Sequence, residues 1–234
     1  DLSRLTTEQR NQVYAEFGPD KNMQLYNRGI RRRLATMLGN DRRRLEMAYS
    51  LQFTLRGTPV LRYGEEIGMG EDLSQGGRKA IRTPMQWSSL PNGGFTSAEK
   101  PIAPVVSGGE YGYETVNVTA QRHDPTSLLA WFERMIRTLR EAPEVSAGSC
   151  RHVDVALPPG VLAHRADAAS GTMLFLHNLS TEPAKCDLSS VYPEADHPTD
   201  VLADQEYADV GRLDALDLDG HGYRWIRLRR TPYS

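Results

Sequence analysis

The residues with the clearest chemical potential form the run Arg82-Thr-Pro-Met-Gln-Trp87, which ends a long glycine-rich segment. Pro84 restricts the backbone beside Arg82, and we expect Met85 and Trp87 to anchor the run in an apolar core. A guanidinium held in this way can form a bidentate ion pair at the floor of a pocket, or it can bind the hydroxyl groups of a sugar. The residue types alone leave both possibilities open.

Two acidic pairs precede this run, Glu65-Glu66 and Glu71-Asp72. Paired carboxylates beyond the end of a strand could form a glycosidase site, in which one is the acid and the other the nucleophile or base. The sequence offers no partner acid from another strand. We therefore favour the interpretation in which one acid anchors the loop by accepting backbone N–H bonds while the other is solvated.

The remaining polar clusters are interpreted as structural. Arg31-Arg-Arg33 and Arg42-Arg-Arg44 could bind phosphates, but on helices they would spread around the circumference, and Asp41 and Glu46 can pair with them. Ion-paired or solvated helix surface is therefore favoured. The six histidines show no metal-ligand spacing, so neither a metal nor a cofactor is predicted. Two glycosylation sequons begin at Asn117 and Asn178, but they are weak signals without a secretory leader.

The elements that must position these residues follow from the spacing of apolar side chains. Helices are predicted from about Glu8 to Phe17, with a capping box over Thr6–Gln9, from Asn22 to Leu38, and from Arg42 to Leu55. A glycine and a proline then stop the third helix, and Thr58–Tyr63 is predicted to be a buried strand. In a parallel α/β fold, the loop that leaves the carboxyl end of such a strand carries the chemistry.

A second domain is predicted after this loop. Asp124-Pro125 is expected to start an amphipathic helix that ends at Ala142-Pro143. The helical period then disappears, and short turn-bounded strands predict a small antiparallel β-sandwich, with strands at Val161–Arg165, Thr172–Asn178, Ala184–Leu188 and Tyr223–Arg229. The apolar parity of the last strand switches between Trp225 and Ile226, which indicates a bulge or burial on both faces. The predicted domains are residues 1–143 and 144–234.

The composition sets broad limits on function. The chain has 234 residues, of which 39% are hydrophobic and 25% charged, as expected for one or two globular domains. A formal net charge of -2 argues against a dedicated partner among nucleic acids or anionic membranes. Two cysteines, Cys150 and Cys186, cannot form a disulfide framework, and no apolar stretch is long enough for a membrane span. A soluble, cytoplasmic protein is the expectation.

Several motifs resemble the α-amylase superfamily. Gly57-Thr-Pro-Val-Leu-Arg-Tyr-Gly-Glu-Glu-Ile-Gly-Met69, followed by Arg82-Thr-Pro-Met-Gln-Trp87, is similar to its eighth barrel strand and the loop after it. The runs Arg28–Leu34, Gly39–Arg44 and, further on, Val116-Asn-Val118 with Asp124–Leu128 resemble the trehalose-synthase branch, which interconverts maltose and trehalose. The resemblance is specific over most of residues 20–140. It is looser at Phe175–Ser180, which is similar to the β-sandwich of the family.

The resemblance implies the C-terminal part of a (β/α)8 barrel, followed by an all-β sandwich domain. The family uses three carboxylates from strands four, five and seven in a retaining double displacement. Because Asp1-Leu-Ser-Arg-Leu resembles the segment just after the last of these, all three are expected to lie outside this chain, and no residue here is assigned a catalytic role. Arg82 and Gln86 are predicted to bind substrate, since Arg82 matches the family arginine at the floor of the glucose subsite. Glu65 stands where relatives often carry Asp and is given no catalytic role.

The predicted function is therefore the C-terminal portion of a trehalose-synthase-like enzyme, inactive as the isolated chain. The expected partners are the N-terminal part of the same enzyme and a small saccharide, and a homo-oligomer is compatible with the sequence. One alternative is an α-glucosidase or a sucrose-acting relative, in which the same Arg82–Trp87 run occurs. An alternative of another class is a non-catalytic module for assembly or sugar binding.

Overall fold

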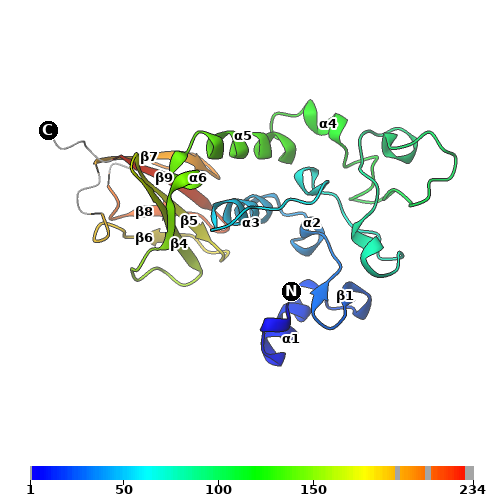
Figure 1. Ribbon diagram of the computed structural model, residues 1–234, viewed down its shortest axis with the longest axis horizontal. Helices are drawn as coiled ribbons and strands as arrows, with labels where there is room; N and C mark the ends of the chain where they lie inside the picture. The colour runs from blue at the N-terminus through cyan, green and yellow to red at the C-terminus, as the bar shows by residue number, and fades with distance from the viewer. Residues whose placement is uncertain (1, 193–195, 209–211, 230–234) are drawn as a thin grey trace. The chain divides into compact units, whose positions relative to one another are not determined.

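The computed structural model describes residues 2–192, 196–208 and 212–229 (Figure 1). The described chain forms two compact units. One contains the residues up to Leu45 and Val60–Phe132, and the other contains Glu46–Pro59 and the residues from Glu133 onward. Helices α3 (Arg42–Thr54) and α5 (Leu128–Arg140) therefore contribute residues to both units. The domain boundary at Pro143 stays a prediction; a short helix, α6 (Pro143–Ala147), begins there.

Helix α1 (Thr7–Phe17) confirms the first predicted helix and its cap. The Thr6 hydroxyl accepts a hydrogen bond from the Gln9 backbone N–H at 3.2 Å, and the Gln9 side chain accepts one from the Thr6 N–H at 3.0 Å. Two backbone donors at the helix start are satisfied reciprocally in this way. The other short helices of this unit are η1 (Leu2–Arg4), η2 (Lys21–Met23), α2 (Leu34–Met37), η3 (Glu65–Ile67), η4 (Gly77–Ile81), η5 (Pro91–Gly94) and α4 (Val118–Arg122).

The predicted helix from Asn22 to Leu38 is wrong. Strands β1 (Gln24–Leu25) and β2 (Gly29–Ile30) form a small antiparallel hairpin there, and only Leu34–Met37 is helical. Tyr26 and Asn27 adopt positive φ angles of 53° and 51°, a conformation that a helix excludes. The apolar spacing of this segment imitates a helical face, but the turn between the two strands decides its conformation.

The predicted buried strand at Thr58–Tyr63 is also wrong for this chain. The segment has no regular secondary structure and pairs with no strand among the described residues, and Val60 is 78% exposed. A β-strand is completed by hydrogen bonds to its neighbours. The prediction of burial fails as well, since of the six residues only Leu61 is half-buried and the others are exposed.

Helix α5 confirms the predicted amphipathic helix, with a different start. Trp131, Phe132 and Met135 of its apolar stripe are buried. Asp124 does not cap the helix: its carboxylate accepts hydrogen bonds from the backbone N–H and hydroxyl of Thr126 within a turn. The cap is Ser127, whose hydroxyl accepts a hydrogen bond from the Ala130 N–H at 3.1 Å.

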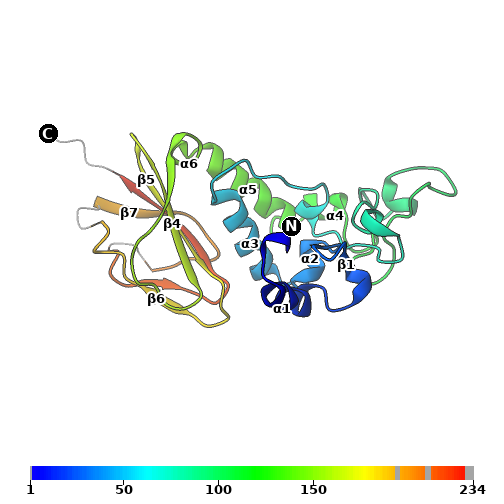
Figure 2. The ribbon, with the colours of Figure 1, turned by 60° about the horizontal axis from the view of Figure 1, so that its bottom comes forward.

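The second unit contains the predicted antiparallel β-domain (Figure 2). Five strands follow in the order β3-β4-β5-β9-β7, and a two-stranded sheet, β6-β8, is the second layer. The strands are β3 (Ser149–His152), β4 (Val161–Ala168), β5 (Gly171–Asn178), β6 (Ala184–Cys186), β7 (Asp196–Ala203), β8 (Leu216–Leu218) and β9 (Tyr223–Arg229). The four predicted strands correspond to β4, β5, β6 and β9.

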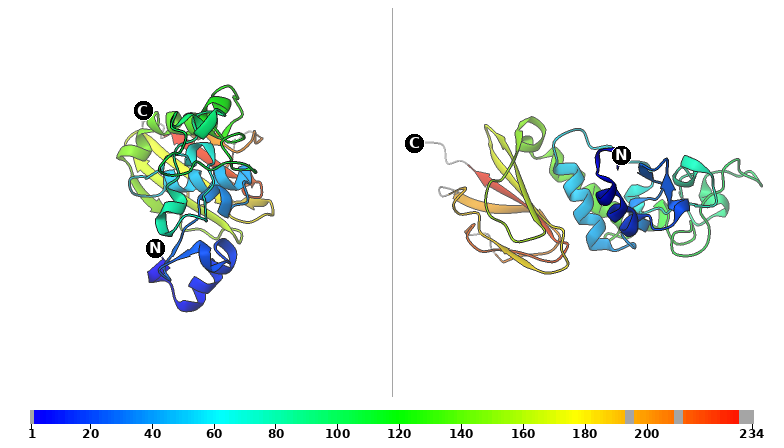
Figure 3. Two further views of the ribbon diagram at one scale, coloured as in Figure 1. Left: turned by 90° about the vertical axis from the view of Figure 1, so that its right-hand side faces the viewer. Right: turned by 90° about the horizontal axis from the view of Figure 1, so that it is seen from below.

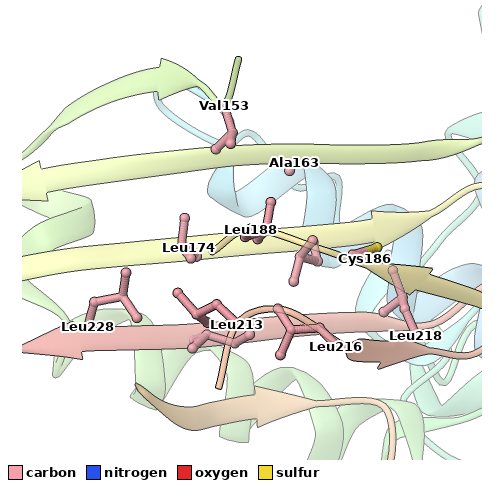
Figure 4. Packing of buried hydrophobic residues seen from close by; sticks show 11 residues of the cluster. Val153, Ala163, Leu174, Cys186, Leu188, Leu213, Leu216, Leu218 and Leu228 are labelled. Atoms are coloured by element: carbon pink, nitrogen blue, oxygen red, sulfur yellow. The ribbon is translucent and has the colours of Figure 1, made fainter. Parts of the chain in front are cut away.

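The core of this unit lies between the two sheets, where leucines of β5, β8 and β9 meet (Figure 4). The other face of the large sheet is also covered, because Ser50 and Thr54 of α3 bond to side chains of β4, β5 and β9. Trp225 and Ile226 are consequently both fully buried. The parity switch in β9 therefore reflects burial on both faces of the sheet; the irregularity between Asp200 and Leu202 lies in the neighbouring strand β7, whereas β9 keeps a continuous register with β5.

Candidate functional site

Arg82 lies in the wall of a pocket of about 680 Å³ in the first unit. Its side chain is exposed, and no other described residue forms a hydrogen bond or ion pair with its guanidinium. The pocket is mainly apolar and aromatic and is lined by Tyr63, Glu66, Arg82, Pro84, Met85, Trp87, Phe95, Thr96, Ala98, Lys100, Pro101, Ile102 and Ala103. A cationic donor in an apolar, aromatic pocket suits a ligand with both CH faces and hydroxyl groups.

The backbone after Arg82 is held by buried side chains. Met85 joins a core cluster with Ile67, Met69, Val116 and Val118, so its predicted role as an anchor is confirmed. The prediction for Trp87 is wrong, because its side chain is 49% exposed and lines the pocket instead. The segment between η5 and α4, several residues of which also line the pocket, has no helix or strand among its residues (Figure 3).

Gln86 is the second predicted substrate-binding residue, and the structure places it inside the protein. Its side chain is fully buried, and its amide donates to the carbonyl oxygens of Val116 at 2.6 Å and Tyr111 at 3.1 Å. The backbone carbonyl oxygen of Gln86 accepts a hydrogen bond from the Val118 backbone N–H at 3.0 Å. These bonds tie the Arg82 run to the start of α4. Contact of Arg82 or Gln86 with a substrate stays a prediction.

Of the four acids, Glu71 fulfils the predicted anchoring role. Its carboxylate accepts hydrogen bonds from the Arg33 backbone N–H at 2.9 Å and from Arg32 Nε at 3.1 Å. Asp72 accepts from the backbone and hydroxyl of Ser74. Burial acts to raise the pKa of Asp72, but these hydrogen bonds outweigh it and hold the pKa below its usual value. Both carboxylates of this pair therefore stabilise the conformation of the loop through hydrogen bonds.

The arginines at 31–33 correct the prediction of a helix surface. Their backbone is not helical, and Arg31 and Arg33 are buried. Arg31 donates to the carbonyl oxygens of Leu73 at 2.8 Å and Gln75 at 2.7 Å. Because these donors are used by the loop, a phosphate would have to compete with structural bonds. The three residues act as clamps on the loop that precedes Arg82.

Glu65 and Glu66 are the first two residues of η3, and their side chains have different surroundings. Gly64 begins η3 with a φ of 86°, and an added Cβ there would lie 2.3 Å from the sulfur of Met69. Glu65 accepts from Arg33 Nη1 at 3.3 Å and is not among the residues that line the pocket. Glu66 lines the pocket, and its Oε2 atom is buried without a hydrogen-bond partner among the described residues.

The asparagines of the two sequons have structural surroundings. Asn117 and Asn178 of the two sequons are buried, and their side chains bond to backbone groups. Within the described ranges, no three His, Cys, Asp or Glu side chains converge as metal ligands would. None of the described helices has the length and apolar character that a membrane crossing requires.

Comparisons with known proteins place these features in a family. The model of the α-amylase catalytic domain matches residues 9–148, more than half of the chain. The chain belongs to the α-amylase family. A second model, of the C-terminal domain of sucrose hydrolase-like proteins, matches residues 171–227 within the β-domain.

The chain is 37% identical to a trehalose synthase of Pimelobacter over 97% of its own length, but it spans only 40% of that relative. It is 36% identical to the human amino acid transporter heavy chain SLC3A1 over 43% of its length and 15% of the relative. The solved trehalulose synthase MutB from Pseudomonas mesoacidophila superposes with a TM-score of 0.66 at 21% identity, covering 84% of this chain and 41% of that one. The fold is therefore the C-terminal part of a (β/α)8 barrel followed by a β-domain.

Sequence reasoning missed two residues that line the pocket from the predicted strand end. It placed Tyr63 in a buried strand, and it treated Glu66 only as one of several acids. The signal was present in the Tyr-Gly-Glu-Glu order, because a glycine between an aromatic residue and two acids allows a turn that separates them. Which acid faces the pocket depends on Arg33, which is distant in the sequence.

Proposed function

We propose that the chain supplies the C-terminal part of a trehalose-synthase-like enzyme that interconverts maltose and trehalose. The observation that carries the proposal is that Arg82, which has no ion-pair partner among the described residues, lines an apolar, aromatic pocket within a chain 37% identical to a trehalose synthase. The substrate would be a neutral disaccharide. Its hydroxyl groups would accept hydrogen bonds from the guanidinium, and its CH faces would lie against the aromatic wall.

The chemistry would be a retaining double displacement. A carboxylate attacks the anomeric carbon while a carboxylic acid protonates the departing oxygen, which leaves a covalent glucosyl intermediate and free glucose. If the anomeric hydroxyl of that glucose then attacks, trehalose forms; if water attacks, the outcome is hydrolysis. The three carboxylates are proposed to lie on the rest of the enzyme. The residues of this chain bind and orient: Arg82 holds the sugar, and Gln86 fixes the backbone on which Arg82 stands.

The test is the reaction of the full-length protein with maltose. We expect trehalose as the main product of the wild type. Arg82→Ala should lose this conversion, and Arg82→Lys should lose less of it, because lysine keeps the positive charge but lacks the planar guanidinium with its paired donors. Release of glucose without trehalose would contradict the isomerase and support an α-glucosidase; turnover of sucrose alone would support the sucrose-acting alternative. The isolated chain is predicted to have no glycosidase activity.

A non-catalytic module is the second candidate, and the match to a transporter heavy chain over 43% of the chain favours it. In that case the barrel fragment would serve assembly or sugar binding without turnover. A full-length protein that binds maltose but converts no α-glucoside would support this candidate. A cytoplasmic location and a homo-oligomer also remain predictions, to be checked by fractionation and by the mass of the purified protein.

A further inference from the structure

The second unit contains a pocket of its own, with a volume of about 630 Å³. Its walls come from the end of α3, from α5 and α6, and from β3 and β4, and it shares no lining residue with the pocket at Arg82. The end of α3 is fixed there, because the Thr54 carbonyl oxygen accepts a hydrogen bond from His164 Nε2 at 3.1 Å. We call it the Cys150 pocket, after the half-buried cysteine that lines it. Its size is typical of sites for small molecules.

The wall formed by α6, β3 and β4 is closely packed. Gly148 precedes β3, and a Cβ added to it would lie 2.0 Å from the Glu144 carbonyl oxygen and 2.8 Å from that of Asp167. No larger residue fits at this position, so the backbones of α6 and β4 approach each other directly. Cys150 then pairs with Ala166 in the ladder of β3 and β4, and both residues line the pocket. The pocket is therefore part of the folded frame, and a ligand would not have to open it.

Much of the lining is apolar and comes from three elements. It includes Phe53 of α3, Leu55 just after that helix, and Ile136 and Leu139 of α5. Leu55 and Ile136 are 47% and 39% exposed. A single exposed apolar side chain needs no explanation, but several that meet in one concavity indicate a surface that an apolar group can cover.

The charged side chains of the lining are both cationic. Arg56 and Arg140 are exposed, and no other described residue forms a hydrogen bond or ion pair with either guanidinium. None of the described residues that line the pocket is acidic. The chain as a whole carries 28 basic and 30 acidic residues, so this local excess of positive charge does not follow from the composition. A cleft with charges of one sign concentrates ions of the opposite sign.

We propose that the Cys150 pocket binds a small organic anion with an apolar body, such as an aryl phosphate or an aryl carboxylate. The apolar body packs against Leu55 and Ile136, and the anionic group accepts hydrogen bonds from Arg56 and Arg140. Guanidinium groups recognise phosphate and carboxylate in the same way, so the geometry leaves the choice between these two anions to experiment. The binding site does not depend on the proposed function.

Cys150 provides the readout in the full-length protein. The other cysteine of this chain, Cys186, is fully buried, and burial raises its pKa to about 11, so it should not react at neutral pH. Alkylation of Cys150 by iodoacetamide, a neutral reagent, is followed by mass spectrometry of the peptide that contains it. Phenyl phosphate or phenylacetate should slow this alkylation about tenfold at about ten times its Kd, because the bound anion covers the thiol.

Two further compounds separate the parts of the ligand. Benzyl alcohol has the apolar body without the charge, and inorganic phosphate has the charge without the apolar body. Both should protect Cys150 far less than phenyl phosphate and phenylacetate do, and the better of these two identifies the anion. Equal protection by benzyl alcohol or by inorganic phosphate would overturn the proposal, since one of the two features would then play no part.

Substitution of the arginines tests the assigned contacts. Arg56→Gln and Arg140→Gln are each expected to raise the Kd of the protecting anion about tenfold without changing the melting temperature. The matched control is Arg137→Gln, which removes the same charge from an exposed residue of α5 outside the pocket lining and should leave the Kd unchanged. An equal increase in all three variants would indicate a general effect of charge and would contradict the site.

The rest of the enzyme could occupy the same pocket, and the experiment detects this. Cys150 would then resist iodoacetamide in the native full-length protein without any added anion and would react only after denaturation. That result would overturn the proposal. Conversion of maltose is not measured in any of these experiments, so the anion site and the proposed function can fail independently of each other.

Discussion

At the scale of residues, one glycine determines which side chains face the pocket. Gly64 stands between Tyr63 and the two glutamates, and its φ of 86° is a conformation that residues with a Cβ rarely adopt. The space around it is also full, because an added Cβ would meet the sulfur and Cγ of Met69 at 2.3 and 3.0 Å. Met69 is itself fully buried, so it has little freedom to move away.

We predict that Gly64→Ala lowers the free energy of unfolding of the chain by about 1 to 3 kcal/mol, through backbone strain and the contact with Met69. Chemical denaturation measures the loss. The control is Gly76→Ala, since Gly76 has a φ of -69° and nothing lies within 4 Å of the position of its added Cβ. Equal stabilities of the two variants would contradict the role assigned to Gly64.

Gln86 and Trp87 illustrate what residue types could not predict. Both belong to one short run; hydropathy placed the tryptophan in the core, and the family resemblance of the run placed the glutamine at the substrate. The structure has Trp87 half exposed and Gln86 fully buried, because two backbone carbonyl groups from a loop about thirty residues later accept from the Gln86 amide. For Arg82, the neighbouring residues left a structural ion pair and sugar binding both open, and the structure shows that its side chain lines a pocket.

At the scale of elements, prediction succeeded where local signals and burial agree. The capping box predicted helix α1, the apolar stripe predicted α5, and the bounding turns predicted β4, β5 and β9. Prediction failed at the hairpin β1-β2, where a turn with two residues at positive φ overrides an apolar spacing. It failed again at Thr58–Tyr63, because strand pairing depends on neighbours that the periodicity of one segment cannot reveal.

The contact between α3 and the large β-sheet is an element-scale feature with a pH dependence. The rings of His164 and His177 stack with their centres 5.6 Å apart, and they bond to Thr54 and Ser50 of α3 at 3.1 and 2.8 Å. Burial lowers the pKa of His164 to about 4, and burial together with the neighbouring His164 lowers the pKa of His177 well below its ordinary value. Both imidazoles are therefore neutral in the folded protein.

We predict that the free energy of unfolding decreases as the pH falls from about 6.5 towards about 4. In that interval the unfolded chain takes up protons on these histidines and the folded chain does not. For His164 the loss is on the order of 3 kcal/mol. Denaturation at several pH values measures it, and His164→Gln should flatten the dependence. His123→Gln is the control, because His123 is exposed. The same slope in both variants would contradict the assignment.

At the scale of the whole molecule, the chain carries surfaces that suit a larger fold. It spans 40% of the Pimelobacter relative, and the family fold is a closed barrel in which each strand has two neighbours. The segment at Thr58–Tyr63 pairs with no strand among the described residues, and Val60 and Tyr63 on it are exposed. An exposed apolar segment of this kind can associate with a strand of another chain. In the complete enzyme we propose that the remaining barrel strands cover it.

The last prediction follows from that segment. Produced alone, the chain should turn over no α-glucoside and should associate as its concentration rises, which sedimentation velocity detects. Val60→Lys should reduce the association, because a charged side chain on an exposed edge disfavours pairing. Leu179→Lys, on an exposed turn in the second unit, is the control and should leave it unchanged. Co-expression with the rest of the enzyme should remove the association and give maltose conversion. A monomeric isolated chain that unfolds cooperatively would instead favour the non-catalytic module, since a fragment with an open edge could then be complete in function.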